Sequence, residues 1–257
     1  MTTTGTDQGR SASGEVTIHA TPERVWQALT DAAELERWFP LEARVEPGEG
    51  GTMMMSWKNE FVGNLKILAW EPPRHLRTAW AFHEHDHAAP QVTDYHVTAE
   101  AGGVTRVRVV TSGFPDDPAW DGWVEGTNRG WRYELRALKH YLENFPGQDR
   151  DVVYLRRRVD ISAAEAWGRL FPATGPALSH VAGRVFDEDP PMQWAAVAED
   201  PRDAMLRVSL EPTGAGTDLR DVTVFMSTWG DDAARAGSLA DTWRRELARL
   251  FPEGTDA

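Results

Sequence analysis

The stretch Ala-Thr-Pro-Glu-Arg-Val-Trp at residues 20–26 is matched later in the chain by Ile-Ser-Ala-Ala-Glu-Ala-Trp at residues 161–167. Trp26 therefore aligns with Trp167, at an offset of 167 − 26 = 141 residues. Toward the end of the chain the offset is 112 residues for six positions, namely Thr105, Arg108, Trp131, Glu134, Leu135 and Leu138 with Thr217, Arg220, Trp243, Glu246, Leu247 and Leu250. The second copy thus lacks 141 − 112 = 29 residues from its middle. Two copies of one long unit indicate tandem domains, because the repeats of a solenoid are far shorter.

Residues 20–26 predict the start of a helix. Thr21 is suited to the N-cap, Pro22 to the first helical position, and Glu23 places an acid in the first turn. A short strand is expected before this helix, over residues 14–19, because its residues alternate in character. A second short helix is expected after it, over residues 33–39.

The rest of the first copy predicts a sheet followed by a long helix. Residues 43–111 contain short β-rich runs separated by turn signals at residues 47–51, 72–73 and 102–103, which is typical of an antiparallel meander. A long helix should then run to Pro146-Gly147, because its apolar residues are spaced by three or four. This stripe consists of Trp120, Val124, Thr127, Trp131, Leu135, Leu138 and Leu142.

These elements predict an α+β fold in which each copy forms a curved antiparallel sheet around a long C-terminal helix. We expect a disordered leader over residues 1–13, which are rich in Thr, Gly, Ser and Asp. The first domain is expected over residues 14–147 and a shortened second domain over residues 149–252. Because of its deletion, the second domain should have fewer strands and a shorter final helix.

Composition excludes several classes of function. The net charge of −13 argues against nucleic-acid binding, which relies on clustered Lys and Arg. The basic run at residues 156–158 lies in an alternating stretch and is expected to form a solvated face or ion pairs between the domains. With no cysteine, there is no disulfide and no thiolate site. No apolar stretch approaches a membrane span, and no signal peptide is recognisable, so we expect a cytoplasmic protein. The excess of arginine over lysine indicates a GC-rich bacterial genome.

Five strings carry a resemblance to a known family, and together they span nearly all of the first copy. They are residues 20–26, Arg-Trp-Phe-Pro at 37–40, Trp-Glu-Pro-Pro-Arg-His-Leu at 70–76, Gly-Gly-Val-Thr-Arg-Val at 102–107 and Ser-Gly-Phe at 112–114. The chain resembles the SRPBCC or START-like superfamily, whose fold is the helix-grip fold. Within it, the chain is similar to the family named for the activator of the heat-shock-protein ATPase. The second copy resembles this family only at residues 162–167 and 214–250.

The resemblance implies a cavity between the sheet and the long helix, which in related proteins holds lipids, sterols, polyketides or other apolar molecules. Any single tryptophan is more often part of a solid core, but a set of facing aromatic side chains can line an apolar pocket. The expected walls in the first domain are Trp38, Met55, Trp57, Trp80, Phe82, Tyr95, Trp123, Thr127 and Trp131. Only the first domain is expected to hold a sizeable cavity.

Candidates for chemistry are few. His83, His85 and His87 alternate in the way that a zinc, nickel or copper site requires, but Ala-Ala-Pro follows at once and favours a solvated hairpin loop. His96 lies in a predicted strand, where a hydrogen-bonded histidine is the usual case. No phosphate loop, nucleophile elbow or zinc-protease helix is present. We therefore expect no catalytic residue, no metal and no cofactor.

Three functions remain open. The preferred interpretation is a non-catalytic module that binds a small apolar ligand in the first domain. The second is a cavity enzyme of the cyclase or aromatase type, with Tyr95, His96 or Arg108 handling protons. The third is a co-chaperone-like module with a protein partner, as the family name implies. An enzyme should show a pair of titratable residues aimed into the cavity, and no such pair is recognisable from spacing.

Overall fold

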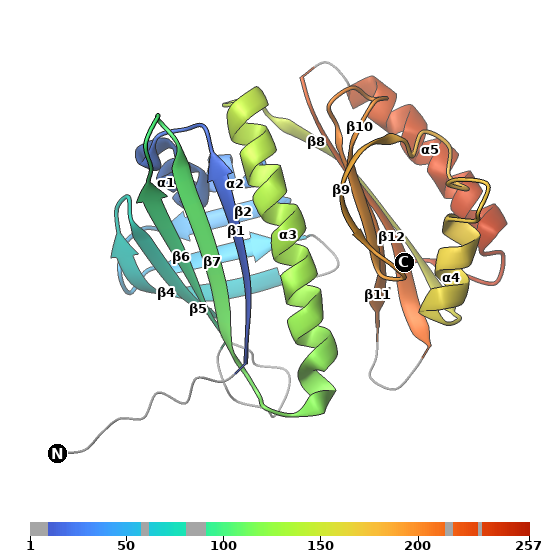
Figure 1. Cartoon of the computed structure of the whole chain (residues 1–257), viewed down its shortest axis with the longest axis horizontal. Helices are drawn as coiled ribbons and strands as arrows, with labels where there is room; N and C mark the ends of the chain where they lie inside the picture. Colours follow the sequence, from blue (N-terminus) through green and yellow to red (C-terminus); the bar gives the residue numbers. More distant parts are fainter. Residues whose placement is uncertain (1–9, 58–61, 81–90, 214–217, 231–232) are drawn as a thin grey trace. The chain divides into compact units, whose positions relative to one another are not determined.

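The computed structural model describes residues 10–57, 62–80, 91–213, 218–230 and 233–257, and the chain divides into two compact units, Met1–Gly147 and Gln148–Ala257. The first unit contains a seven-stranded antiparallel sheet and the second a six-stranded antiparallel sheet, and each unit has a long final helix (Figure 1). The predicted α+β fold class is confirmed.

The sheet of the first unit is an antiparallel meander, and the first strand of the chain is added at its edge beside the last strand. The strands have the spatial order β1-β7-β6-β5-β4-β3-β2, so β1 pairs with the last strand, β7. In chain order the elements are β1 (Arg10–Ile18), α1 (Pro22–Thr30), α2 (Ala32–Glu36), β2 (Glu42–Glu46), β3 (Thr52–Ser56), β4 (Val62–Glu71), β5 (His75–Trp80), β6 (Val92–Ala99), β7 (Thr105–Phe114), the 3-10 turn η1 (Pro118–Trp120) and α3 (Asp121–Asn144).

The two short helices begin at side-chain caps. Thr21 accepts a hydrogen bond from the Arg24 backbone N–H, and Pro22 occupies the first helical position, as the sequence predicts. Asp31 caps α2 by accepting from the Glu34 N–H. Helix α2 therefore begins one residue earlier than expected and ends at Glu36.

The predicted leader over residues 1–13 was too long, because β1 begins at Arg10. Ser11 to Ser13 pair with Ser112 to Val110 of β7, and Ala12 is fully buried between two exposed serines. Small polar residues can form a strand where a neighbouring strand supplies their backbone hydrogen bonds and every second side chain is buried.

Helix α3 packs closely against β1. A Cβ placed on Gly14 would lie 2.8 Å from Leu135 Cδ1 and 3.1 Å from Trp131 Cβ, so the absence of a side chain permits this approach. The second half of the helix is buried, with Leu135 and Leu138 at 2% and 0% exposure. The first half, residues 121–130, contains no fully buried residue.

A polar network joins the helices of the first unit. Glu34 is 6% exposed, and its carboxylate lies 2.6 Å from Arg24 Nη2 and 2.9 Å from Arg37 Nη1. It also accepts a hydrogen bond from the Tyr141 hydroxyl at 2.8 Å. The Tyr141 hydroxyl in turn accepts from the Gly147 N–H at 2.9 Å. Burial raises the pKa of Tyr141. The carboxylate is thus compensated by charge and hydrogen bonds, which is what allows it to be buried.

The second unit is a shorter version of the same arrangement. In its described residues it has one short α-helix where the first unit has two, and its final helix has 18 residues instead of 24. Its sheet order is β13-β8-β12-β11-β10-β9. The elements are β8 (Arg150–Asp160), α4 (Ala163–Leu170), β9 (Gly183–Asp189), β10 (Gln193–Ala198), β11 (Met205–Pro212), β12 (Leu219–Trp229), α5 (Ala233–Leu250) and β13 (Thr255–Asp256).

The arginine run of β8 has a role different from the two that the sequence suggested. Arg156 and Arg158 both bind the Asp221 carboxylate on the neighbouring strand. Arg157 points to the other side of the strand, where it donates to the Phe251 carbonyl and to Asp256. The run therefore holds β8, β12 and the C-terminal segment together within the second unit.

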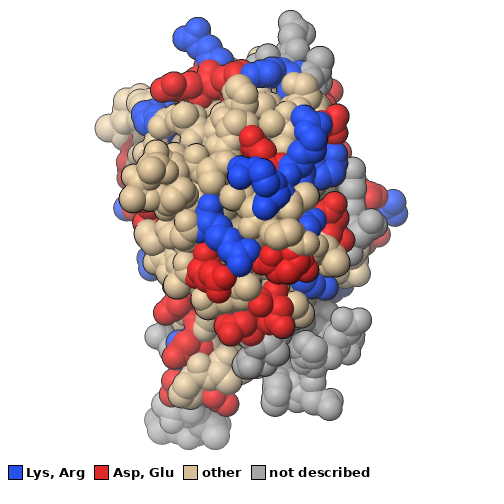
Figure 2. Space-filling model, turned by 90° about the vertical axis from the view of Figure 1, so that its right-hand side faces the viewer, with Lys and Arg blue, Asp and Glu red and all other residues tan. Residues whose placement is uncertain are grey.

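The surface does not suggest a nucleic-acid partner on the face that Figure 2 draws. Among the described residues visible there, Lys and Arg side chains are interspersed with Asp and Glu. No helix in the described part of the chain is long and apolar enough to cross a membrane.

Candidate functional site

A row of threonines crosses three strands of the first sheet. Thr78 of β5 lies opposite Thr93 of β6, which lies opposite Thr111 of β7. All three side chains therefore share one face, and the row meets α3 because the Trp131 indole N–H donates to Thr111 Oγ1 at 2.9 Å. We call this helix-side surface the inner face of the sheet.

The hydroxyls of the row are unequally satisfied. Thr93 and Thr111 bond to each other at 3.0 Å. Thr78 is 1% exposed, and its Oγ1 atom has no hydrogen-bond partner among the described residues. A buried hydroxyl without a partner costs about 1–3 kcal/mol, so native proteins rarely leave one without a reason.

Tyr95 lies beside the row on the same face. It is two residues from Thr93 along β6, is 6% exposed, and its ring meets that of Trp131 edge to face at 5.7 Å. Burial raises the pKa of Tyr95 far above its ordinary value, so the hydroxyl stays protonated and can donate.

Phe39, which follows α2, connects the aromatic residues of the site. Its ring is stacked on Trp38 at 5.0 Å, meets Trp57 edge to face at 5.2 Å, and lies 6.0 Å from Trp131. Each pair of rings in such an arrangement contributes about 0.5–1.5 kcal/mol to stability beyond the contribution of its buried area. The predicted wall residues Trp57, Tyr95 and Trp131 are therefore brought into one cluster.

Three other predicted wall residues have different surroundings. Trp38 is 1% exposed, and its indole N–H donates to the Ala28 carbonyl at 2.8 Å, so this tryptophan fastens the segment after α2 to α1. Met55 of β3 is buried opposite Gly63 of β4. The Trp80 ring covers Gly63 so closely that a Cβ there would lie 2.4 Å from it.

The remaining predicted residues are not joined to this cluster by a described contact. Trp123 is 58% exposed and pairs with Trp120, with ring centroids 6.0 Å apart. The Thr127 hydroxyl donates to the Trp123 carbonyl at 2.8 Å and is thus used within the helix. Phe82 and the histidine loop at residues 83–87 lie outside the described residues.

The three proton-handling candidates do not gather at one place. Tyr95 faces inward, whereas His96, its neighbour along β6, is exposed on the other face. Arg108 is paired with His96 across the strands and is exposed as well. Side chains alternate along a strand, so these residues cannot act together on a molecule bound at the inner face.

Sequence reasoning missed four residues of the site: Phe39, Thr78, Thr93 and Thr111. Phe39 is part of the Arg-Trp-Phe-Pro string, so a signal for it existed. The threonines gave none, because they form a row only through the register of β5, β6 and β7.

Comparison with known proteins identifies the family of the first unit. Residues 19–143 match the family model described as activator of Hsp90 ATPase homolog 1-like protein. The first unit of this chain belongs to that family. The resemblance inferred from the sequence strings is thus confirmed, and the match to the Hsp90 ATPase activator homolog family ends before the second unit begins.

Several solved structures are similar to the chain. Protein MLL2253 from Mesorhizobium loti is 26% identical, with 53% of this chain and 98% of that chain covered and a TM-score of 0.48. The Aha1 dimer from Colwellia psychrerythraea is 21% identical, with coverages of 54% and 99% and a TM-score of 0.48. DynU16, from the dynemicin biosynthetic locus, is 17% identical, with coverages of 94% and 98% and a TM-score of 0.46. No curated protein matches the chain.

Proposed function

We propose that the first unit binds a small, largely apolar molecule between the inner face of its sheet and α3, without catalysing a reaction. The molecule carries an uncharged hydroxyl, carbonyl or similar group, which bonds to the threonine row and Tyr95. The observation that carries the proposal is the buried Thr78 hydroxyl, which has no partner among the described residues and lies on the face of the sheet that also carries the buried Tyr95 and meets the Trp131 ring.

The energetics support a ligand of this chemistry. The unpartnered buried hydroxyl of Thr78 costs about 1–3 kcal/mol, which a hydrogen-bonding group on the ligand would recover. The rings of Phe39, Trp57 and Trp131 supply apolar contact and are rigid, so little entropy is lost when they hold a ligand. A charged ligand is disfavoured, because its charge would have to be desolvated beside an apolar wall.

The separation of the polar candidates supports binding rather than catalysis. A cyclase would need proton donors and acceptors on the face that holds the substrate. Tyr95 faces inward without His96 or Arg108, and burial raises its pKa, so it is a hydrogen-bond donor rather than a base. The cyclase and co-chaperone alternatives stay predictions without a supporting contact in this chain.

We assign the ligand to the first unit only. In the second unit the corresponding face is lined by aliphatic side chains such as Val208, Val222 and Val224, each 0% exposed. Its tryptophan on the final helix, Trp243, donates to the Ser179 carbonyl at 2.7 Å. These contacts favour a packed core that does not take up a ligand.

Two matched probes test the proposal: 2-naphthol and 2-methylnaphthalene, which differ in one hydroxyl. We expect Tyr95→Phe to weaken 2-naphthol binding about 2- to 13-fold, the equivalent of the roughly 0.5–1.5 kcal/mol of one neutral hydrogen bond. Binding of 2-methylnaphthalene should not change. Both affinities can be measured by fluorescence titration of the full chain.

Thr98→Val is the matched control, because Thr98 is exposed on the opposite face of the same strand. It should leave both affinities unchanged. If neither probe binds the wild-type chain, or if Tyr95→Phe weakens both probes equally, the proposed binding mode is wrong.

A further inference from the structure

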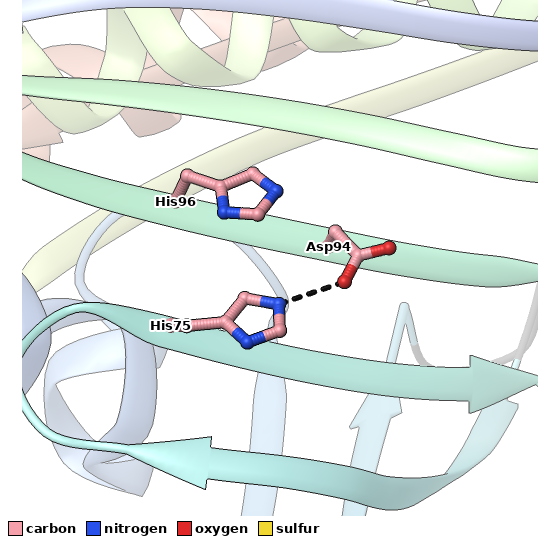
Figure 3. A group of neighbouring side chains, drawn as sticks. All are labelled: His75, Asp94 and His96. Atoms are coloured by element: carbon pink, nitrogen blue, oxygen red, sulfur yellow. Dashed lines mark hydrogen bonds and ion pairs between the residues drawn. The ribbon is translucent and has the colours of Figure 1, made fainter.

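Two histidines and an aspartate form a cluster on the outer face of the first sheet, opposite the threonine row. His75 of β5 lies directly across from His96 of β6, and Asp94 is two residues before His96 on the same face. Figure 3 shows both imidazole rings directing a nitrogen toward the side on which Asp94 lies. The three side chains share no face with Tyr95, which sits between Asp94 and His96 in the sequence.

The geometry of this cluster is compact. The His75 Nε2 atom lies 2.7 Å from Asp94 Oδ1. The two imidazole rings are parallel within 4°, with centroids 4.8 Å apart. One ligand atom from each of the three residues can be chosen so that all lie within 4.8 Å of one another.

We propose that His75, Asp94 and His96 form a binding site for a divalent late transition-metal ion, of which Zn²⁺ is the probe. Tetrahedral zinc with bonds of about 2.0–2.1 Å places its ligand atoms roughly 3.4 Å apart. The cluster reaches this spacing by rotation of side chains, and His96 is exposed and has room to move. The ion would replace the proton that His75 and Asp94 share.

The surroundings decide which ion fits. Two neutral imidazoles and one carboxylate suit Zn²⁺, Ni²⁺ or Cu²⁺, whereas Mg²⁺ and Ca²⁺ need more oxygen ligands. Arg77 Nε lies 3.8 Å from Asp94 Oδ1, and Arg108 lies across the strands from His96. These two positive charges repel a cation, so an ion that is attracted by charge alone would bind weakly. The selectivity must therefore come from the imidazole nitrogens.

One further feature favours coordination by the histidines. Glu71 Oε1 lies 3.8 Å from His75 Nδ1, on the side away from Asp94. A carboxylate there can orient the ring of a metal-bound histidine.

The experiment uses the full chain without a histidine tag, stripped of metal and titrated with Zn²⁺ by calorimetry. We expect one saturable site per chain that excess Mg²⁺ does not block. A His75→Gln/His96→Gln variant should bind Zn²⁺ at least about 100-fold more weakly, since even the outer partners of metal ligands contribute about 10- to 100-fold.

A triple variant, His83→Gln/His85→Gln/His87→Gln, is the control, because these residues are the other histidine cluster of the chain. It should bind Zn²⁺ as the wild type does. Since His96 is exposed, His96→Gln alone should fold normally by circular dichroism and still lose affinity. The proposal is overturned if the wild type shows no saturable site, if the double variant binds normally, or if the triple variant loses binding.

Discussion

Thr78→Val and Thr111→Val should change the stability of the first unit in opposite directions. Both replace a buried threonine of the same row by a side chain of the same branched shape. They differ in what the hydroxyl does. Thr78 Oγ1 has no partner among the described residues, whereas Thr111 Oγ1 accepts from the Trp131 indole and bonds to Thr93.

The magnitudes follow from the hydrogen bonds. Removing the Thr78 hydroxyl eliminates a desolvated, unpaired group and should raise the free energy of unfolding by about 1–3 kcal/mol. Removing the Thr111 hydroxyl leaves the Trp131 N–H unpaired in a buried position and should lower it by about 1–3 kcal/mol. A unit of this size shifts its Tm by about 2–4 °C per kcal/mol, so the two variants should differ clearly.

Scanning calorimetry of the full chain, supported by urea unfolding, measures both changes. In the 2-naphthol titration, Thr78→Val should also weaken binding, so the more stable variant would be the weaker binder. If Thr78→Val destabilises the protein as much as Thr111→Val does, the Thr78 hydroxyl has a partner and the argument for a ligand group beside it fails.

Three further predictions concern packing in the first unit, and a fourth concerns the buried Asp221 of the second unit. Gly14→Ala should destabilise the first unit by about 1–3 kcal/mol, because the added methyl would overlap Leu135 on α3; an unchanged urea midpoint would contradict this packing. Glu34→Ala should cost about 3 kcal/mol in urea unfolding, because it leaves two arginines and a tyrosine without their carboxylate. A loss below roughly 1 kcal/mol would mean that this network behaves like a surface ion pair. Leu135→Ala should cost about 2–5 kcal/mol, while Trp123→Ala should hardly change the Tm because its ring is 58% exposed; equal melting temperatures would contradict the assignment of the two helix halves. Burial alone would raise the pKa of Asp221, but hydrogen bonds from two arginines outweigh it and lower the pKa. Its stabilisation is therefore complete above about pH 3.9 and is lost as the pH falls through the lower folded pKa. Asp221→Asn should flatten this acid dependence in pH-dependent melts, and an unaltered acid profile would show that Asp221 does not carry it.

Local signals were sufficient to predict much of the fold. The Thr-Pro-Glu sequence at residues 21–23 predicts the start of α1 because a helix N-terminus needs a cap and tolerates proline. The stripe ending at Leu142 predicts the long helix because burial of one face imposes its spacing. The start of β1 at Arg10 was missed, since the strand depends on hydrogen bonds to β7, about 100 residues away.

The site was less predictable because it depends on register. A shift by one residue would turn a strand's side chains to the opposite face. The aromatic residues Trp57, Tyr95 and Trp131 could be chosen from composition and helix spacing, but the alignment of Thr78, Thr93 and Thr111 could not. Tyr95 and His96 are a different case: they are adjacent in one predicted strand, so alternation alone places them on opposite faces, and this signal in the sequence was missed.

The partners of charged residues were also hidden in the sequence. Glu34 and Tyr141 are 107 residues apart in the chain, and no local pattern connects them. The arginine run at residues 156–158 suggested a solvated face, yet its alternating directions place two arginines on Asp221 and one on the C-terminal segment. Such pairs form because a buried charge must find compensation wherever the fold supplies it.

Native mass spectrometry of the full chain, purified from the cells that naturally make it, would show whether the first unit holds a ligand. We expect a retained small molecule, bound one per chain, that is largely apolar and carries an uncharged hydrogen-bonding group. The same purification of the Tyr95→Phe variant should recover less of it. If the wild-type chain carries only the mass of its polypeptide under conditions that preserve weak complexes, or if the retained molecule is charged, the claim is contradicted.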